Sequence, residues 1–273
     1  MRPLRLLHTS DVHIGGGYRA PSHGDHHDHC LCPLVVIERL VIAESIDAVL
    51  IVGDLFDHQR VSPDLVSEVL DRLGALGVPC VVINGNHDVH DEASIYHPQT
   101  VGQSGVHFFD DHEGKQVELF DGALNLWAKA MPIHDRQFRP LQDVPPRPRG
   151  DSWWVVLGHG HYEPVEQDHF GRSSPLSPED IEATRADYLA LGHWHVRTDV
   201  STDSVVAWYS GAPYGVVTSD QMNVIDLHPE TGVEVGSVTV SLPAEGCRLE
   251  IVGLDGRLVA GPDLDTRIEP LLI

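Results

Sequence analysis

The sequence predicts an α/β protein built on a parallel sheet, and two patterns support this prediction. Short apolar runs, which are typical of buried strands, occur at residues 4–7, 48–52, 80–83, 124–131, 153–157 and 188–191. Segments with helical spacing separate the first three runs, at residues 34–46 and 63–76. Strands that alternate with helices form parallel sheets, because right-handed crossovers return each strand in the same direction.

The helix expected at residues 63–76 has a clear start signal, with Ser62 at the N-cap and Pro63 at the first helical position. A further helix is expected from Ser177, because Pro178 follows it directly and Asp180 stands where a capping box needs an acidic residue. This helix leads into the strand at residues 188–191.

After residue 205 the pattern changes to short alternating segments separated by Gly, Pro and Asp, at residues 205–209, 222–227, 233–242 and 247–252. Such alternation favours antiparallel strands. Two segments of biased composition are expected to be surface loops: residues 22–29, rich in His, and residues 139–150, rich in Pro and Arg.

The amino-acid composition limits the binding partners and the cellular compartment that can be expected for the protein. Over 273 residues, 18 Lys and Arg stand against 41 Asp and Glu, so the net charge is −23 with His neutral, which disfavours unspecific attraction to polyanions. The four cysteines, Cys30, Cys32, Cys80 and Cys247, show no disulfide framework, and Cys80 opens an apolar run as a reduced core thiol would. With no signal region and no apolar run of 18 residues, we expect a cytoplasmic protein that binds no membrane.

Metal-binding side chains follow five of the expected strands. The segments are DVH at 11–13, GDLFD at 53–57, GNHD at 85–88, GHGH at 158–161 and GHWH at 192–195. In open α/β sheets ligands bind beyond the carboxyl ends of the strands, where all five segments lie. Together they offer enough oxygen and nitrogen donors for a dinuclear hydrolytic centre.

The first two segments supply carboxylates. Asp11 and His13 lie on one side of an extended segment, so both can reach one cation. Asp54 follows Gly53 at a sharp turn and is the natural carboxylate to bridge two ions, whereas Asp57 and His58 are expected to support ligands rather than to bind metal.

The other segments supply amide and imidazole donors. In GNHD, Asn86 offers an amide oxygen, His87 an imidazole that need not bind metal, and Asp88 a carboxylate to orient that imidazole. In GHGH, His159 is the expected ligand because it comes first after the strand, and His161 is the alternative. Histidine favours Mn, Fe, Zn, Ni or Co over Mg or Ca.

These motifs, in this order, resemble the calcineurin-like metallophosphoesterase superfamily, whose pattern of DxH, GDxx, GNHD, H and GHxH is met from Asp11 to His195. Their surroundings, HTSDVHIG, DAVLIVGDLFD, VINGNHD, DYLALGHWH and YSGAPY, are most similar to SbcD-type DNA repair exonucleases. The resemblance implies a four-layer α/β/β/α sandwich with mixed sheets. For this chain we expect a single domain over residues 1–273, in which the strands at about 205–252 complete the second sheet and no separate cap domain is present.

The resemblance further implies two divalent metal ions, with Mn²⁺ favoured and Fe, Zn, Ni or Co as alternatives. The implied ligands are Asp11, His13 and His195 for the first ion, Asn86, His159 and His193 for the second, and Asp54 between them. His87, oriented by Asp88, would stabilise the charge that develops on the phosphate or protonate the leaving alkoxide. The metals would activate a hydroxide and clamp the phosphate oxygens.

A phosphodiesterase that resembles a DNA exonuclease is therefore the favoured function. The alternatives are a phosphodiesterase or phosphomonoesterase of small molecules such as cyclic nucleotides, and a non-catalytic scaffold of the same fold. The repair nucleases carry a DNA-binding cap and a segment that docks on a partner ATPase, and since little of this chain follows Val252, we expect neither. The oligomeric state is left open, a homodimer included.

Two further segments could contact substrate. The basic side chains best placed for nucleic acid are Arg136, Arg139, Arg147 and Arg149, although a solvated Pro-rich loop is the favoured interpretation of their segment. The insertion after DVH could bind an extra metal, but it lacks the paired spacing of a structural zinc site, so a flexible polar loop is favoured there.

Overall fold

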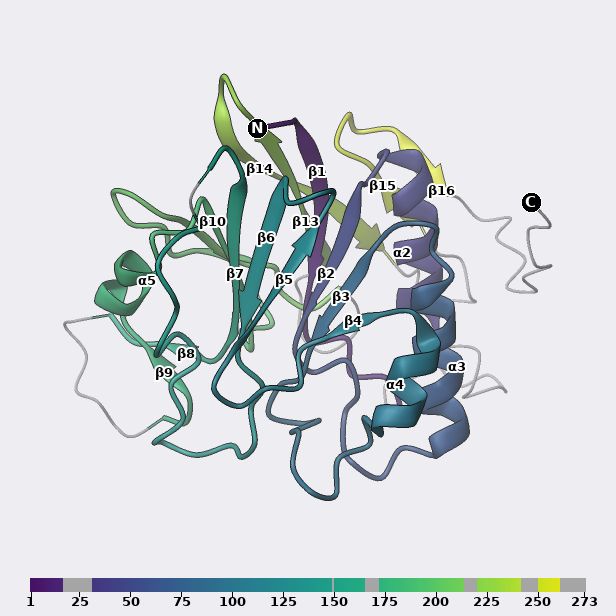
Figure 1. Ribbon diagram of the computed structural model, residues 1–273. Helices are drawn as coiled ribbons and strands as arrows, with labels where there is room; N and C mark the ends of the chain where they lie inside the picture. The colour runs from purple at the N-terminus through teal and green to yellow at the C-terminus, as the bar shows by residue number, and fades with distance from the viewer. Residues whose placement is uncertain (17–30, 149, 165–171, 214–219, 242–249, 261–273) are drawn as a thin grey trace.

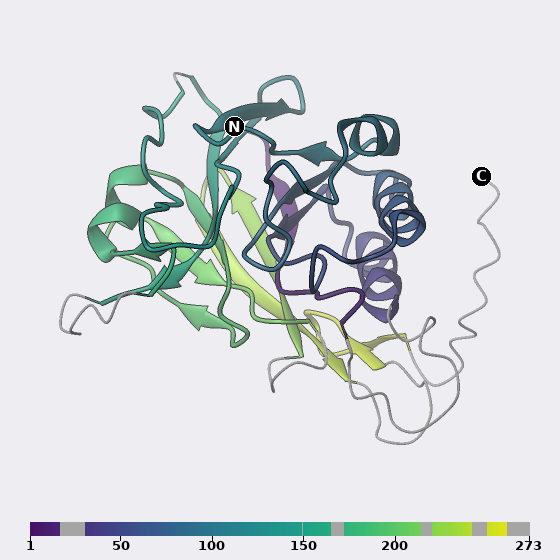
Figure 2. The ribbon, with the colours of Figure 1, turned by 90° about the horizontal axis from the view of Figure 1, so that it is seen from below.

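The computed structural model describes residues 1–16, 31–148, 150–164, 172–213, 220–241 and 250–260. Two mixed sheets lie face to face, with helices on the outer side of each, so the predicted four-layer α/β/β/α architecture is confirmed (Figure 1). One helical layer consists of α2 (Cys32–Ala43), α3 (Pro63–Gly74) and α4 (Pro98–Ser104). The opposite layer contains the short helix α5 (Pro178–Thr184), and the view from below in Figure 2 shows the two helical layers on opposite flanks.

The larger sheet has eight strands among the described residues, in the order β16-β15-β14-β13-β1-β2-β3-β4. Its parallel half begins at the N-terminus with β1 (Leu4–Thr9), β2 (Ala48–Val52), β3 (Cys80–Ile83) and β4 (His107–Phe108). Its antiparallel half consists of β13 (Gln221–His228), β14 (Gly232–Ser241), β15 (Glu250–Val252) and β16 (Leu258–Ala260). The predicted strand, helix, strand, helix, strand order is confirmed.

The second sheet has six described strands, in the order β11-β12-β10-β7-β6-β5. Its members are β5 (Lys115–Leu119), β6 (Leu124–Ala128), β7 (Trp153–His159), β10 (Tyr188–Gly192), β11 (Thr198–Asp199) and β12 (Val206–Tyr209). A separate two-stranded ribbon pairs β8 (His161–Tyr162) with β9 (Pro175–Leu176). The ribbon follows β7 directly along the chain.

The strands after residue 205 differ from the expectation that they complete the second sheet. Only β12 joins that sheet, beside β10, whereas β13 pairs antiparallel with β1 and so extends the first sheet. The physical reason is that β13 is apolar on both faces. Met222 and Val224 face the helical layer, and Ile225 and Leu227 face the other sheet, as a strand in the middle of a covered sheet requires.

Alternating side chains of the same strands divide the interior into separate cores. In β2, Val49 and Ile51 pack under the helices, while Leu50 and Val52 pack between the two sheets. A third core lies on the outer face of the second sheet, where Ile181 of α5 joins Trp154, Val156, Leu189 and Leu191. The covered faces explain why the predicted strands are continuous apolar runs.

The predicted helix starts are confirmed at both capped helices. The Ser62 hydroxyl accepts a hydrogen bond from the Leu65 amide at 3.3 Å at the start of α3. At α5, Ser177 and Asp180 form a reciprocal capping box, in which the Ser177 amide donates to the Asp180 carboxylate at 2.8 Å. Cys80 is a buried free thiol whose pKa is raised by burial, as expected of a reduced core cysteine.

None of the described helices combines the length and the apolar character that spanning a lipid bilayer requires. The His-rich segment at residues 22–29, Cys30, Cys247 and Arg149 lie outside the described residues.

Candidate metal centre

The five motifs meet at one edge of the two sheets. Asp11 follows β1, Asp54 follows β2, Asn86 follows β3, His159 ends β7 and His193 follows β10. The sheets are joined at this edge, since the Nδ1 hydrogen of His159 donates to the backbone carbonyl oxygen of Val52 at 2.9 Å. The prediction that these strand ends converge is confirmed, because the carboxyl ends of parallel strands point in the same direction.

Asp11, His13 and His195 form one group of donors, with ligand atoms that all lie within 4.8 Å of one another. The Asp11 Oδ1 and His13 Nε2 atoms are buried and have no hydrogen-bond partner in the part of the chain that the structure describes. Buried polar atoms normally have partners, and a cation bound between these two would supply one. The donor set therefore fits a divalent transition-metal ion.

Asp57 fixes the orientation of His13. The Asp57 Oδ1 atom lies 3.0 Å from His13 Nδ1, which leaves His13 Nε2 to face the donor group, 3.9 Å from Asp54 Oδ2. A carboxylate behind a metal-binding histidine fixes the ring and makes its free nitrogen a better donor. The expectation that Asp57 supports a ligand agrees with this contact.

A second group of donors surrounds Asn86. Its amide oxygen lies 2.8 Å from His193 Nδ1 and 3.0 Å from His159 Nε2, and the same His159 nitrogen lies 3.3 Å from Asp54 Oδ2. Because the Nδ1 of His159 donates to a carbonyl oxygen, its Nε2 is the nitrogen directed at Asp54 and Asn86. Asp54 thus contacts both groups, as expected of a bridging carboxylate.

The electrostatics of the centre favour a cation. Burial alone would lower the pKa of His159, but the carboxylates of Asp54 and Asp11 outweigh it and raise that pKa to about 9. Burial would raise the pKa of Asp54, yet the neighbouring His159 and His13 hold it well below its usual range. The pKa of His193 is lowered to about 3, by burial and then by the charge of His159. A field that stabilises a protonated imidazole would stabilise a metal ion in the same place.

The backbone that carries these donors is strained. Asp11, His13 and Asp54 have φ values of 54°, 52° and 52°, and His193 has a φ of 102°. Such values are uncommon for residues other than glycine and concentrate at functional sites, where the surrounding structure holds them. Four of the seven expected ligands therefore have this uncommon backbone conformation.

The glycines of the motifs make room for the donors. A Cβ atom at Gly53 would lie 2.0 Å from His159 Nδ1, and one at Gly85 would lie 2.3 Å from Asp54 Oδ1. Gly192 is equally confined, since its Cβ would lie 1.9 Å from the carbonyl oxygen of Val52. Any larger residue at these positions would separate the two sheets or displace the donors.

The expectation that Asp88 orients His87 is wrong, because the two side chains have other partners. The Asp88 carboxylate accepts hydrogen bonds from the Gly85 amide at 2.7 Å, the Phe56 amide at 3.1 Å and the Tyr96 hydroxyl at 2.6 Å. The His87 ring is held by the backbone of the neighbouring loop, since its Nδ1 lies 2.7 Å from the Asp57 carbonyl oxygen. Asp88 is fully buried, so it organises the loops instead of touching the exposed imidazole.

The model of the calcineurin-like phosphoesterase family matches residues 4–197, which include all five motifs and the strands that carry them. The chain belongs to this family. It is therefore a metal-dependent phosphoric ester hydrolase, and the donor groups described above fit that chemistry.

Several proteins of this family are similar to the chain over most of its length. The SbcD component of the SbcCD nuclease of Bacillus subtilis (strain 168) is 27% identical over 272 residues, covering 83% of this chain and 67% of that protein. DNA double-strand break repair protein Mre11 of Methanosarcina acetivorans is 26% identical over 263 residues, covering 88% of this chain and 39% of that protein. The uncharacterized metallophosphoesterase YhaO of Bacillus subtilis is 24% identical over 238 residues, covering 76% of this chain.

The chain spans about half the length of YhaO (52%) and less of Mre11. Among solved structures, that of TT1561 of Thermus thermophilus is similar with a TM-score of 0.56 at 11% identity, covering 85% of this chain and 98% of that one. This likeness supports the fold.

Two residues around the centre of this phosphoesterase, Tyr96 and His134, were not predicted to take part, and a third, His161, was expected only as the alternative to His159. Tyr96 binds Asp88, and the ring of His134 lies 6.2 Å from that of His193. His161, the alternative to His159, accepts a hydrogen bond from the Trp194 indole at 3.1 Å, with its ring 5.8 Å from that of His193. His161 belongs to a metal-binding segment, whereas Tyr96 and His134 do not, so no sequence motif indicated those two residues.

Proposed function

We propose that this phosphoesterase is a dinuclear phosphodiesterase that cleaves nucleic-acid strands, with two divalent ions, Mn²⁺ favoured, held by Asp11, His13, Asp54, Asn86, His159, His193 and His195. The observation that carries the proposal is the position of Asp54, whose Oδ2 lies 3.9 Å from His13 Nε2 in one donor group and 3.3 Å from His159 Nε2 in the other. Two such ions, when bound, supply Lewis-acid charge to the phosphate and lower the pKa of bound water.

His87 is the protein group that we assign to the reacting phosphate. Its Nδ1 donates to the Asp57 carbonyl oxygen, because a carbonyl can only accept, so Nε2 is the nitrogen left for substrate. Its side chain is 42% exposed, whereas the expected ligands Asp11, His13, Asp54 and His159 are buried. From this position Nε2, when protonated, can stabilise charge on a phosphate oxygen or give its proton to the leaving alkoxide.

Support for a nucleic-acid substrate comes from the relatives, since SbcCD is named as a nuclease and Mre11 as a DNA double-strand break repair protein. A small phosphodiester is the second candidate, and it is favoured by the net charge of −23, which opposes a long polyanion. We further propose that the protein is cytoplasmic, because the buried free thiol of Cys80 suits a reducing compartment.

The test is a substrate panel with the purified chain reconstituted with Mn²⁺: linear and circular single-stranded DNA, duplex DNA, cyclic nucleotides, and the mono- and diester forms of one aryl phosphate. We expect cleavage of DNA and a preference for the aryl diester over the monoester. Asp54→Asn and His87→Gln should abolish both activities. Cleavage confined to small esters would overturn the nuclease assignment, and preference for the monoester would overturn the phosphodiesterase assignment.

A further inference from the structure

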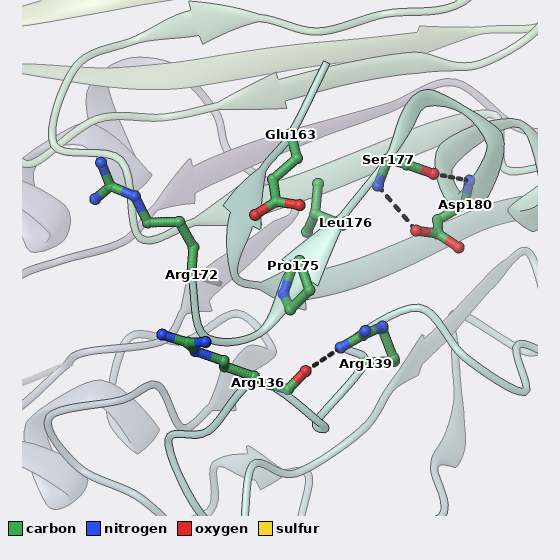
Figure 3. Close-up of a pocket in the computed structure, with 8 residues that line it drawn as sticks. All are labelled: Arg136, Arg139, Glu163, Arg172, Pro175, Leu176, Ser177 and Asp180. Carbon is green, nitrogen blue, oxygen red and sulfur yellow. Dashed lines mark hydrogen bonds between the residues drawn. The ribbon is translucent and has the colours of Figure 1, made fainter. Parts of the chain in front are cut away.

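A cavity of about 400 Å³ is lined by three arginines, Arg136, Arg139 and Arg172 (Figure 3). Glu163 and Asp180 also line it, and the Asp180 carboxylate is engaged by the Ser177 amide at 2.8 Å. The lining therefore has more positive than negative groups. In a chain with only 18 lysines and arginines and a net charge of −23, three arginines at one cavity mark the place for an anion.

Backbone hydrogen bonds join the segments that carry these arginines. The Ser174 amide donates to the Asp135 carbonyl oxygen at 2.8 Å, which links the loop of Arg136 to the strand that follows Arg172. The His161 amide in turn donates to the Ser174 carbonyl oxygen at 3.0 Å, which adds the segment of Glu163. Backbone hydrogen bonds therefore hold together the segments that form the cavity wall.

The Asp135 side chain shapes the loop that presents two of the arginines. Its Oδ1 accepts hydrogen bonds from the amides of Gln137 at 2.8 Å and Phe138 at 2.9 Å, as in an Asx turn. Arg136 and Arg139 are thereby held on one turn, where the Arg139 guanidinium also contacts the Arg136 carbonyl oxygen. Both side chains are exposed, so a solvated ligand can reach them.

The same segments reach the metal centre. His134, two residues before Arg136, has its ring 6.2 Å from that of His193, and His161, two residues before Glu163, has its ring 5.8 Å from the same residue. His193 is an expected ligand of the second ion. Two of the segments that line the cavity therefore also border the candidate metal centre.

We propose that Arg136, Arg139 and Arg172 bind a second phosphate of the substrate, next to the phosphate that is cleaved, so that the enzyme prefers substrates with at least two phosphates. The proposal rests on the phosphodiesterase activity proposed above. Guanidinium groups suit phosphate because they offer several donors in a planar fork. Such contacts fix the register of a strand and not its sequence. The second phosphate could be the next one along a strand or a terminal one, and these two sources share the same chemistry.

The experiment compares kcat/KM for short thymidine substrates with the Mn²⁺-reconstituted protein. A dinucleotide has only the scissile phosphate, and a trinucleotide has a second one. Two further trinucleotides carry one neutral, uncleavable methylphosphonate linkage, on the 3′ or the 5′ side of the remaining phosphodiester. A dinucleotide with a 5′-terminal phosphate separates the two sources of the second phosphate.

We expect the wild type to prefer the trinucleotide to the dinucleotide by about tenfold, mainly through KM, and to lose this preference when one of the two linkages is neutral. Arg136→Gln and Arg172→Gln should each reduce the preference by about two- to fivefold, the range for exposed charge contacts. Arg39→Gln and Arg257→Gln, exposed arginines on α2 and before β16, are the matched controls and should keep it.

An equal kcat/KM for all wild-type substrates would overturn the second-phosphate site while leaving the phosphodiesterase assignment intact. A preference that the Arg136 and Arg172 variants retain would also overturn it. If the wild type cleaves none of these substrates and no aryl diester, the proposed function itself fails. The methylphosphonate comparison uses the wild type alone, so the result does not depend on the folding of a variant.

Discussion

The hydroxyl of Tyr96 donates a 2.6 Å hydrogen bond to the buried carboxylate of Asp88. The same carboxylate accepts from the amides of Phe56 and Gly85, so it joins the loop after β2 to the loop after β3. These loops carry Asp54, which contacts both donor groups, and Asn86, which belongs to the second. Burial, and then the charge of Asp54, raise the pKa of Asp88 to about 6, and the hydrogen bonds act in the opposite direction.

Tyr96→Phe should destabilise the fold by about 1–3 kcal/mol, because it leaves a buried carboxylate without one of its donors. The ring itself is kept, and with it the stacking on Phe108 at 4.4 Å between centroids. We also expect weaker metal binding, since the two loops lose a shared anchor. Urea unfolding and metal titration measure the two effects.

Tyr188→Phe is the control for this variant. It removes a hydroxyl that lies 2.8 Å from His8 Nδ1, equally buried but between the sheets and away from the loops. It should reduce stability without changing metal affinity. Equal losses of metal affinity in both variants would contradict the role of Asp88 as a link between the loops.

His87→Gln should lower kcat on an aryl phosphodiester by about 100-fold or more, the usual effect of removing a general acid, while metal content stays the same. The reason is that His87 Nδ1 is held by the Asp57 carbonyl oxygen, and its side chain, which is 42% exposed, is not among the seven expected ligands. Metal analysis by mass spectrometry after dialysis gives the second measurement. Asp54→Asn should instead lose both activity and metal, and loss of metal from the His87 variant would make His87 a ligand.

Gly85→Ala should reduce activity by about 100-fold through displacement of donors, because its Cβ would lie 2.3 Å from Asp54 Oδ1 and 2.8 Å from His159 Nε2. Gly102→Ala, on helix α4, meets nothing within 4 Å and should leave activity unchanged. Activity and metal affinity of both variants are to be compared. Full activity of the Gly85 variant would show that the loops shift freely around the centre.

Much of this centre could be predicted from the sequence because its donors follow buried strands directly. A strand that is apolar along its whole length, such as residues 48–52, fixes where the chain leaves the sheet and therefore where Asp54 lies. The glycines before Asp54, Asn86 and His193 indicate close packing at the same places.

Contacts between side chains in the loops, and the choice of partner strand, could not be predicted in this way. Asp88 was paired with His87 because the two are adjacent, but the partner that the loops bring to it is Tyr96, eight residues later. His134 stands in a loop after β6 without a motif, and its approach to His193 depends on the path of that loop along the edge of the second sheet, to which β6 and β10 both belong. Likewise, the pairing of β13 with β1 joins residues more than 200 positions apart, and alternation alone does not select a partner strand.

A buried histidine between the sheets should make the fold sensitive to acid. His8 is fully buried, and burial lowers its pKa from 6.5 to about 3. Between these two values the unfolded chain binds a proton at His8 that the folded chain does not, so stability falls as the pH decreases from about 6.5. The loss at this one group is at most about 1.4 kcal/mol for each pH unit.

His8→Gln removes this proton, so the stability difference between wild type and variant should shrink as the pH is lowered from 7.5 to 5. Urea unfolding at pH 7.5, 6.5, 5.8 and 5 measures it, and the histidines of the metal centre affect both proteins alike. His97→Gln, at an exposed position before α4, should run parallel to the wild type over the same range. Parallel curves for the His8 variant would mean that the buried imidazole is protonated in the folded protein, with the Tyr188 hydroxyl accepting its Nδ1 hydrogen.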